Sequence, residues 1–339
     1  MKVVTFGEIM LRLAPKGYYR FFQNSDMEAT FGGGEANVAI SLSNFGVKST
    51  FVSRLPQNDI GQSAIKELNK FGVDTSKIIR DEHRVGIYFL EKGASQRPSK
   101  VIYDRTHSSI SHAEINQFDW HEIFKDVDLF HFTGITPSLS KSVAKVCLEA
   151  LKVAKEYNVT VSCDLNYRKN LWSTEQAKET MTELMTYVDV LIANEEDAQK
   201  VFGIASFNTN VESGQLNREG YIDVAQRLVD KFGFSTVFIT LRESLSANDN
   251  KWSAMKYCNK TAYFSKKYNL HIVDRVGGGD SFAAGAIYSV LQKMENQQSI
   301  EFAVAASALK HSIEGDFNRV SLDEVLALTN GDSTGRVQR

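Results

Sequence analysis

The chain of 339 residues alternates between short apolar runs and longer amphipathic stretches over most of its length. The short runs are rich in β-branched residues, which is typical of strands buried on both faces. They lie at residues 2–7, 49–55, 128–135, 159–165, 189–194 and 235–241. Stretches with helical spacing separate them, at residues 35–46, 59–72, 138–157, 174–186, 195–202 and 219–233. This alternation predicts an α/β fold with a mostly parallel central sheet and helices on both faces.

Local signals mark the ends of the first two predicted helices. Gly46 and Gly72 follow the last periodic residues, where a glycine commonly ends a helix. Asp59 precedes the second apolar stripe, so we expect it to be the N-cap of that helix.

Two regions interrupt the alternation of strands and helices. Residues 8–31 and 84–105 contain strand-like runs with polar alternation and no helix between them. We expect them to form a small β lid on the edge of one domain that spans residues 1–330. Residues 205–218 are a polar insertion without periodicity, and residues 331–339 are a probable site of fraying because they are polar and terminal.

Composition narrows the range of partners. The net charge is −2, so no general field attracts nucleic acid or an anionic membrane. No run of eighteen apolar residues is present, and Glu8 interrupts the apolar start, which argues against a membrane span and a signal peptide. Cys147, Cys163 and Cys258 are widely spaced and odd in number, as expected for reduced thiols. We therefore expect a cytoplasmic protein.

A cluster of three glycines, Gly277 to Gly279, leads directly into Asp280 and a helical stretch. One interpretation is a flexible turn with Asp280 as a simple N-cap. A cap alone needs no triple glycine, however, whereas bare amides at a helix N-terminus can approach an anion closely. The alternative is an anion hole with Asp280 as a side-chain base at its mouth.

An earlier glycine cluster precedes the first helix. The amides of Gly33 and Gly34, with the side chain of Asn37, can bind a hydroxylated ligand, although a plain loop before a helix explains them equally well. Neither cluster is a Walker A loop, because the chain contains no Gly-Lys dipeptide. Phe282 occupies the position of the third glycine of a GxGxxG motif, so a dinucleotide-binding dehydrogenase loses its main support.

Together the two clusters resemble those of the ribokinase-like carbohydrate kinases. That family has an early Gly-Gly loop followed by an Asn, and a late Gly-Ala-Gly-Asp motif that opens a helix. Gly278 replaces the usual Ala here, and Arg275 and Val276 replace the usual Thr-x before the motif. The resemblance implies a ribokinase-like fold and attack of a sugar hydroxyl on the γ-phosphate of ATP. Asp280 would then accept the proton, and the amides of Gly277 to Gly279 would hold the phosphate charge.

The family also has an N-x-x-E motif that organises the phosphates and Mg²⁺. Here it reads NEED, from Asn194 to Asp197, so the carboxylate of Asp197 stands where the Glu is usual. The resemblance implies an indirect role for Asp197 at the metal. The ATP contacts that it implies are listed here: Asn166, Arg168, Asn194, Thr240, Gly277 and Gly279.

Five segments are similar to those of the family's 2-keto-3-deoxygluconate kinases: residues 86–89, 101–105, 131–135, 163–172 and 315–318. This similarity implies ATP-dependent formation of 2-keto-3-deoxy-6-phosphogluconate. The substrate contacts implied are Gly33, Gly34, Asn37, Tyr88, Tyr103, Arg105, Arg168 and Asp280. An arginine suits a sugar acid because its planar fork can hold a carboxylate by two hydrogen bonds.

Other interpretations remain open. The arginines could form surface salt bridges, and the substrate could be a neutral sugar, as in a fructokinase. A non-catalytic sugar or nucleotide sensor on the same fold is a further alternative. The exposed edge of the β lid favours pairing of two copies into a homo-oligomer.

Overall fold

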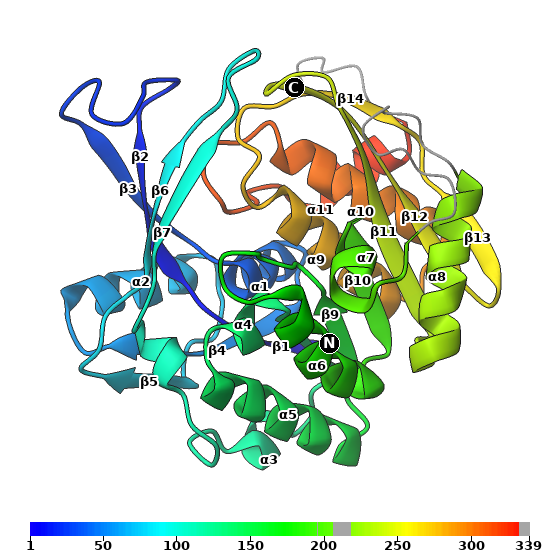
Figure 1. Ribbon diagram of the computed structural model, residues 1–339, viewed down its shortest axis with the longest axis horizontal. Helices are drawn as coiled ribbons and strands as arrows, with labels where there is room; N and C mark the ends of the chain where they lie inside the picture. The colour runs from blue at the N-terminus through cyan, green and yellow to red at the C-terminus, as the bar shows by residue number, and fades with distance from the viewer. Residues whose placement is uncertain (195, 206–217, 332–339) are drawn as a thin grey trace.

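The computed structural model describes residues 1–194, 196–205 and 218–331, and most of these residues belong to one α/β body (Figure 1). The predicted insertion at residues 205–218 and the tail at 331–339 fall almost entirely outside these ranges.

A ten-stranded sheet runs through the centre of the described residues. Seven of its strands are mutually parallel, and in spatial order they are β5 (Ile78–Asp81), β4 (Lys48–Pro56), β1 (Lys2–Phe6), β8 (Leu129–Thr133), β9 (Thr160–Asp164), β10 (Val190–Asn194) and β11 (Thr236–Ser244). Six of the seven are the strands that the apolar runs predict, and the mostly parallel sheet is confirmed.

The sheet continues beyond β11 with antiparallel strands that the pattern of apolar runs did not predict. These are β12 (Asp249–Cys258), which pairs with β11, and β13 (Thr261–Phe264) and β14 (Tyr268–His271), which both pair with β12. Lysines and asparagines interrupt β12, so its sequence lacks the continuous apolar run of a doubly buried strand.

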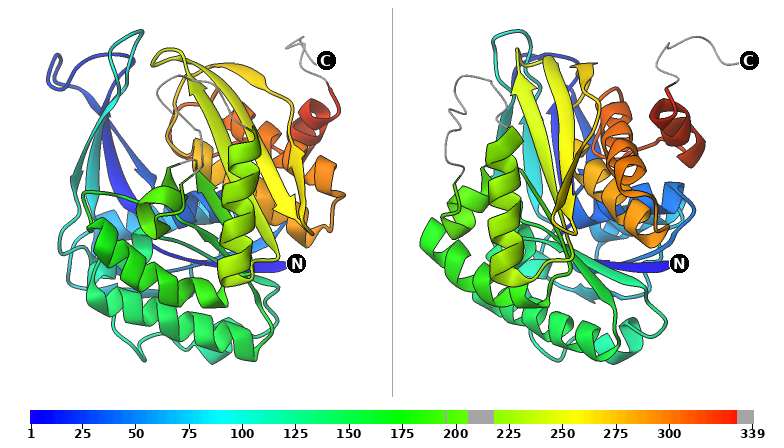
Figure 2. Two further views of the ribbon diagram at one scale, coloured as in Figure 1. Left: turned by 45° about the vertical axis from the view of Figure 1, so that its right-hand side comes forward. Right: turned by 90° about the vertical axis from the view of Figure 1, so that its right-hand side faces the viewer.

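Helices cover both faces of the sheet (Figure 2). One face carries α5 (Lys141–Glu156), α6 (Thr174–Leu184), α7 (Asp197–Phe202) and α8 (Arg218–Phe232), and the other carries α1 (Gly34–Asn44), α9 (Gly278–Leu291), α10 (Asn296–Lys310) and α11 (Leu322–Thr329). The shorter α2 (Asp59–Lys70) packs beside β4, and α3 (Trp120–Ile123) and α4 (Ile135–Ser138) are single turns.

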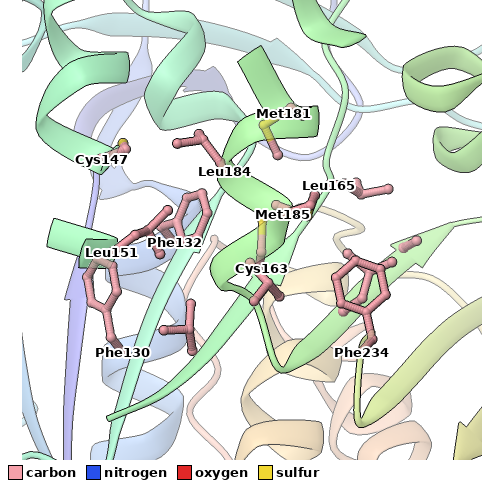
Figure 3. Packing of buried hydrophobic residues seen from close by; sticks show 14 of the residues in the cluster. Phe130, Phe132, Cys147, Leu151, Cys163, Leu165, Met181, Leu184, Met185 and Phe234 are labelled. Carbon is pink, nitrogen blue, oxygen red and sulfur yellow. The ribbon is translucent and has the colours of Figure 1, made fainter. Parts of the chain in front are cut away.

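Successive residues of the central strands enter different cores, because side chains alternate between the faces of a sheet. Val4 packs with the α5–α8 layer, for example, and Val3 with the α1–α9 layer. Figure 3 shows the first of these cores, where Phe130 and Phe132 of β8 meet Leu151 of α5.

A separate four-stranded sheet stands apart from the main body, at the upper left of Figure 1. Its strand order is β3 (Met27–Gly32), β2 (Met10–Pro15), β6 (Ile87–Glu91) and β7 (Lys100–Asp104). All four strands come from the segments 8–31 and 84–105. We call them the lid sheet.

The helix ends follow the sequence signals with one correction. Gly46 and Gly72 lie just beyond α1 and α2 with φ of 80° and 76°, the left-handed conformation that ends a helix. The N-cap of α2 is Asn58, not Asp59, because the Asn58 side chain accepts a hydrogen bond from Gly61 N. Asp59 is instead the first helical residue, where its charge suits the helix dipole.

Two further expectations can be compared with the structure. The three cysteines are unpaired and buried, as predicted. Among the helices of residues 1–194, 196–205 and 218–331, none is long and apolar enough to cross a bilayer.

Candidate active site

The candidate site lies where several parallel strands end beside the N-termini of α1 and α9. Asp164 ends β9 and Asn194 ends β10, and Asn194 is paired in register with Thr240 of β11. Open α/β sheets bind their ligands at the carboxyl ends of strands, so this position fits the prediction for a site.

Two adjoining cavities open here. All eight predicted substrate residues, Gly33, Gly34, Asn37, Tyr88, Tyr103, Arg105, Arg168 and Asp280, line the first cavity, which we call the sugar cavity. All six predicted ATP residues, Asn166, Arg168, Asn194, Thr240, Gly277 and Gly279, line the second, which we call the nucleotide cavity. Asn166, Arg168 and Asp280 lie on the wall that both cavities share.

Asp280 is not the N-cap of its helix. The cap is Gly277, with φ of 82°, and α9 begins at Gly278, which makes Asp280 the third helical residue. Its carboxylate instead accepts a hydrogen bond of 2.6 Å from Asn37 Nδ2. Burial raises the pKa of Asp280 to about 6, and the Asn37 hydrogen bond counteracts part of this rise.

The two glycine clusters hold this pair of side chains from opposite sides. Asn37 Oδ1 accepts a hydrogen bond of 3.3 Å from Gly33 N, which turns the amide nitrogen of Asn37 toward Asp280. A side chain at Gly34 would lie 3.6 Å from Asp280 Oδ1. The early cluster is therefore more than a loop before a helix, because it positions the partner of Asp280.

The three late glycines have different surroundings. A Cβ at Gly277 would contact the carbonyl oxygen of Asp316, and one at Gly278 would contact the His311 ring. Gly278 N donates to Arg275 O at 3.2 Å, and Gly278 lines neither cavity, so the anion-hole expectation does not extend to its amide. Gly279 faces open space in the nucleotide cavity, and its N–H has no acceptor in the described part of the chain.

The two predicted arginines differ in their partners. Arg105 is buried, forms an ion pair with Glu8, and lies 5.5 Å from the centre of the Tyr103 ring. Arg168 is exposed, contacts only the carbonyl of Tyr167 at 3.2 Å, and has no carboxylate partner among the described residues. The salt-bridge interpretation therefore holds for Arg105, whereas Arg168 has a guanidinium that remains available to a ligand.

With this geometry established, comparison with known proteins decides the family. Residues 1–318 match the profile of the pfkB family carbohydrate kinases. The chain belongs to this family. It is therefore a carbohydrate kinase, and the predicted ribokinase-like fold is confirmed.

The kinase is similar to three characterised or solved relatives over nearly its whole length. It is 52% identical to the crystal structure of a 2-dehydro-3-deoxygluconokinase from Thermotoga maritima, with a TM-score of 0.94 and coverage of 98% of this chain and 100% of that one. It is 30% identical to a 2-dehydro-3-deoxygalactonokinase from Haloferax volcanii, covering 98% of each chain. A 2-dehydro-3-deoxygluconokinase from Bacillus subtilis is 26% identical, covering 96% of this chain and 94% of the relative.

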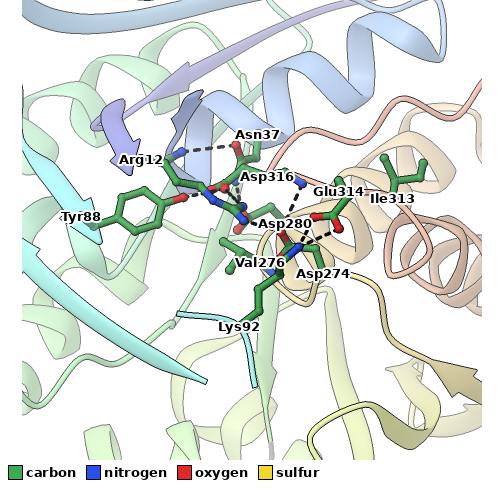
Figure 4. Close-up of polar contacts among 12 residues, drawn as sticks. Arg12, Asn37, Tyr88, Lys92, Asp274, Val276, Asp280, Ile313, Glu314 and Asp316 are labelled. Carbon is green, nitrogen blue, oxygen red and sulfur yellow. Dashed lines mark hydrogen bonds and ion pairs between the residues drawn. The ribbon is translucent and has the colours of Figure 1, made fainter. Parts of the chain in front are cut away.

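A buried polar network beside the sugar cavity was missed by the sequence reasoning (Figure 4). Arg12 of the lid sheet donates to Asp274 at 2.5 Å and to Asp316 at 2.7 Å. The hydroxyl of Tyr88, also in the lid sheet, donates to Asp316 at 2.5 Å. The network ties two lid strands to the segment that leads into Gly277, so the lid sheet and the glycine loop are mechanically linked in the kinase.

Glu35 is a second carboxyl group on the wall of the sugar cavity. Its Oε1 accepts hydrogen bonds from Thr133 N, Thr133 Oγ1 and Thr136 Oγ1 at 2.9, 2.8 and 2.5 Å. Burial raises its pKa to about 7, although these hydrogen bonds oppose the rise. Its place directly after Gly34 was the one available sequence signal, and a helix-face residue was the ordinary interpretation.

Asp197 does not line either cavity. Its two carboxylate oxygens accept hydrogen bonds from Tyr167 N and Asn194 N, each at 3.3 Å. It therefore holds the backbone at the ends of β9 and β10, while residue 195 of the same motif lies outside the described ranges. Asp164 and Glu196 are the carboxylates of this region that do line the nucleotide cavity.

The far wall of the nucleotide cavity is aromatic. Trp252 and His311 both line it, with ring centres 5.2 Å apart. Burial lowers the pKa of His311 to about 4, so this ring is neutral at physiological pH. Trp252, which the sequence indicated as a packing residue, both packs in the core and contacts the cavity.

Proposed function

We propose that this kinase transfers the γ-phosphoryl group of ATP to the terminal hydroxyl of 2-keto-3-deoxygluconate, also called 2-dehydro-3-deoxygluconate. One observation carries the proposal: Asp280 lies on the wall shared by the two cavities, with Asn37 on one side and the free amide of Gly279 near the other. A base at this point can reach an acceptor in one cavity and a phosphate in the other.

The chemistry follows from this arrangement. Asp280 accepts the proton of the sugar hydroxyl as its oxygen bonds to the γ-phosphorus. The bond between that phosphorus and the bridging oxygen breaks, and ADP leaves with the electron pair. The N-terminus of α9 and the Gly279 amide stabilise the charge on the transferred group, which is the main catalytic contribution in a loose phosphoryl-transfer transition state.

Arg168 supports a sugar acid as the substrate. It lines the sugar cavity, and it is the cationic side chain there that lacks a carboxylate partner within the described ranges. A guanidinium can bind the carboxylate of a sugar acid through two parallel hydrogen bonds, whereas a neutral sugar offers no such group. Arg105 has a different role, because its charge is already balanced by Glu8.

The carboxylates of the nucleotide cavity fit a magnesium ion that arrives with ATP. Asp164 lines the cavity, and its pKa is raised by burial and by the nearby charges of Asp197 and Asp280. No group of three or more ligating side chains is assembled among the described residues, as expected for an ion held mainly by phosphates and water. When bound, Mg²⁺ would neutralise phosphate charge; Asp164 and Glu196 would accept hydrogen bonds from its water shell, and Asp197 would act indirectly.

The names of the relatives support this substrate class. The Thermotoga maritima protein is named as a kinase of the gluconate-derived acid and the Haloferax volcanii protein as a kinase of the galactonate-derived one. The second acid is the C4 epimer of the first, so it is a specific second candidate. We place the gluconate-derived acid first because the identity to its kinase is 52% rather than 30%.

A coupled assay of ADP release tests the proposal directly. Wild-type enzyme should turn over 2-keto-3-deoxygluconate with Mg·ATP at a higher kcat/KM than its C4 epimer, fructose or ribose. Preference for the epimer would assign the second candidate. Preference for a neutral sugar would replace the acid-sugar assignment, and the absence of turnover with any of them would favour a sensor.

We further propose that two copies of the kinase pair through the lid sheet. All five residues of β7 are exposed, although three of them, Val101, Ile102 and Tyr103, are large and apolar or aromatic. An exposed edge strand with such residues favours pairing with another strand. Because Tyr103 lines both cavities, a second copy on β7 would also close the outer wall of the site.

A further inference from the structure

Lys310, the last residue of α10, is a buried lysine that the chemistry above does not use. Its side chain is 0% exposed. The ammonium donates to two backbone carbonyls, Asp274 O at 3.3 Å and Ile313 O at 3.2 Å. Burial of an ammonium is costly unless its surroundings stabilise the charge, so its position demands a physical reason.

The two carbonyls belong to the two segments that enclose the glycine loop. Asp274 begins the segment that leads into Gly277, and Ile313 begins the turn that leads to Asp316. A Cβ at Gly277 would lie 3.2 Å from Lys310 Cε, so the lysine stem packs directly behind the cap residue of α9. Lys310 therefore joins both segments from the buried side, opposite the nucleotide cavity.

The charge of Lys310 is not cancelled by a contacting carboxylate in the described part of the chain. The nearest acidic side chain by sequence of contacts, that of Asp274, already pairs with Arg12 at 2.5 Å. Burial lowers the pKa of Lys310, while the charges of Asp274 and Asp316 oppose that change. A cation held by carbonyl dipoles keeps its field, and in a water-poor interior this field extends to nearby anions.

We propose that Lys310 is a positioning residue for phosphoryl transfer: its buried ammonium fixes the Gly277 loop for the phosphate and supplies a permanent positive charge behind Asp280. This inference rests on the proposed role of Asp280 and adds a residue that touches neither substrate. It also explains why the anion site can work in a chain with a net charge of only −2, since the charge is supplied locally.

Several charged groups act on Asp280 together with Lys310. Asp316 and the buried environment favour the protonated acid, whereas Lys310 and Arg168 favour the carboxylate. Removal of the Lys310 charge should therefore raise the pKa of Asp280. The groups that also face Lys310 are unchanged by its substitution and are listed here: Arg12, Asp274, Asp316 and, next in the chain, His311.

The test compares Lys310→Met with Lys256→Met. Lys256 is a matched control: it is also buried with a lowered pKa, but it donates to Ser299 Oγ at 3.1 Å and lines no cavity described here. Lys310→Met should lower kcat by about 10- to 100-fold, because small misplacements at a reacting centre have effects of that size. KM for the sugar should change little, and the acid limb of kcat/KM should move to higher pH. Lys256→Met should leave all three quantities near those of wild type.

The outcomes separate this inference from its alternatives. A kcat within twofold of wild type, or a reduced kcat with an unmoved acid limb, would overturn the electrostatic part of the proposal. If Lys310→Met does not fold, Lys310→Gln keeps a hydrogen-bond donor without the charge, and the same shift of the limb is expected. Asp280→Asn is measured alongside: if that variant retains activity, the failure lies in the assignment of the base and not in Lys310. The acceptor is whichever sugar wild type phosphorylates best, so the result does not depend on the substrate assignment.

Discussion

At the scale of single residues, the contact between Asn37 and Asp280 decides how the carboxylate is presented. The hydrogen bond of 2.6 Å joins the start of α1 to the start of α9, two segments more than 240 residues apart in the chain. It favours the ionised form of Asp280, while burial favours the neutral form. The balance leaves a base with a pKa of about 6, which is close to the pH at which a general base works best.

Replacement of this base tests its role. Asp280→Asn should lower kcat by about 10²–10⁴-fold, the usual effect of losing a general base. The fold should persist because Asp280 does not cap α9, and binding of the sugar should change far less than kcat. Steady-state kinetics, calorimetric titration of the sugar and thermal unfolding provide the measurements. Asp59→Asn, on the exposed first turn of α2, is the matched control. Near-normal kcat in Asp280→Asn would make the residue structural only.

The pH dependence gives a second prediction at this scale. A base must be deprotonated, so kcat/KM should fall as pH decreases through about 6. Asn37→Leu removes the hydrogen bond that lowers the pKa of Asp280, so the acid limb should move to higher pH. Glu35, whose pKa is about 7, could also titrate in this range, and Glu35→Gln distinguishes the two groups. A limb that moves in Glu35→Gln and not in Asn37→Leu would assign the titration to Glu35.

At the scale of elements, the start of α9 assigns separate tasks to its glycines. Gly277 provides a left-handed cap that packs against the backbone at Asp316, and Gly279 leaves its amide free beside the cavity. The network of Arg12, Asp274 and Asp316 holds the same turn to the lid sheet. The helix is therefore placed by its buried contacts, and its open amide remains available to an anion.

Two glycine variants should separate these tasks. Gly277→Ala should destabilise the fold by more than about 1–2 kcal/mol, because the left-handed backbone is unfavourable for alanine and its Cβ would contact the carbonyl of Asp316. Gly279→Val should leave the free energy of unfolding nearly unchanged but lower ATP turnover by at least about 100-fold, since a side chain then occupies the anion site. Denaturant unfolding and ADP release are the two measurements. Normal turnover by folded Gly279→Val would remove the anion-hole argument.

At the scale of the whole molecule, the lid sheet gives a prediction about assembly. Ile102, which is 54% exposed on β7, should be covered by a second copy. Light scattering should give twice the mass of one chain for wild type and the mass of one chain for Ile102→Lys, because a buried unpaired charge disfavours the interface. Ile115→Lys, at an exposed position outside the lid sheet, should stay dimeric. A monomeric wild type at micromolar concentration would contradict the pairing.

The sequence predicted the parallel strands because their apolar runs are continuous, and it predicted the helix ends because Gly46 and Gly72 stand there. It indicated the residues of both cavities through motifs at the two glycine clusters. It could not predict the Arg12 network, whose partners lie 262 and 304 residues away and show no local periodicity. Nor could it show that Arg105 is neutralised by Glu8, because that pairing depends on how the lid sheet packs.

The central claim is that the site selects a sugar acid through Arg168, and one measurement tests it most directly. We would determine kcat/KM for 2-keto-3-deoxygluconate and for fructose in wild type, Arg168→Ala, Arg168→Lys and Arg105→Ala. A charge-assisted hydrogen bond contributes roughly 1.5–3 kcal/mol, equivalent to about 10- to 150-fold in kcat/KM.

Arg168→Ala should therefore lower kcat/KM for the acid by about that factor and for fructose far less, with partial recovery in Arg168→Lys because lysine lacks the planar fork. Arg105→Ala should harm both substrates, since it leaves Glu8 buried without its partner. A wild type that prefers fructose, or an equal loss for both substrates in Arg168→Ala, would contradict the account.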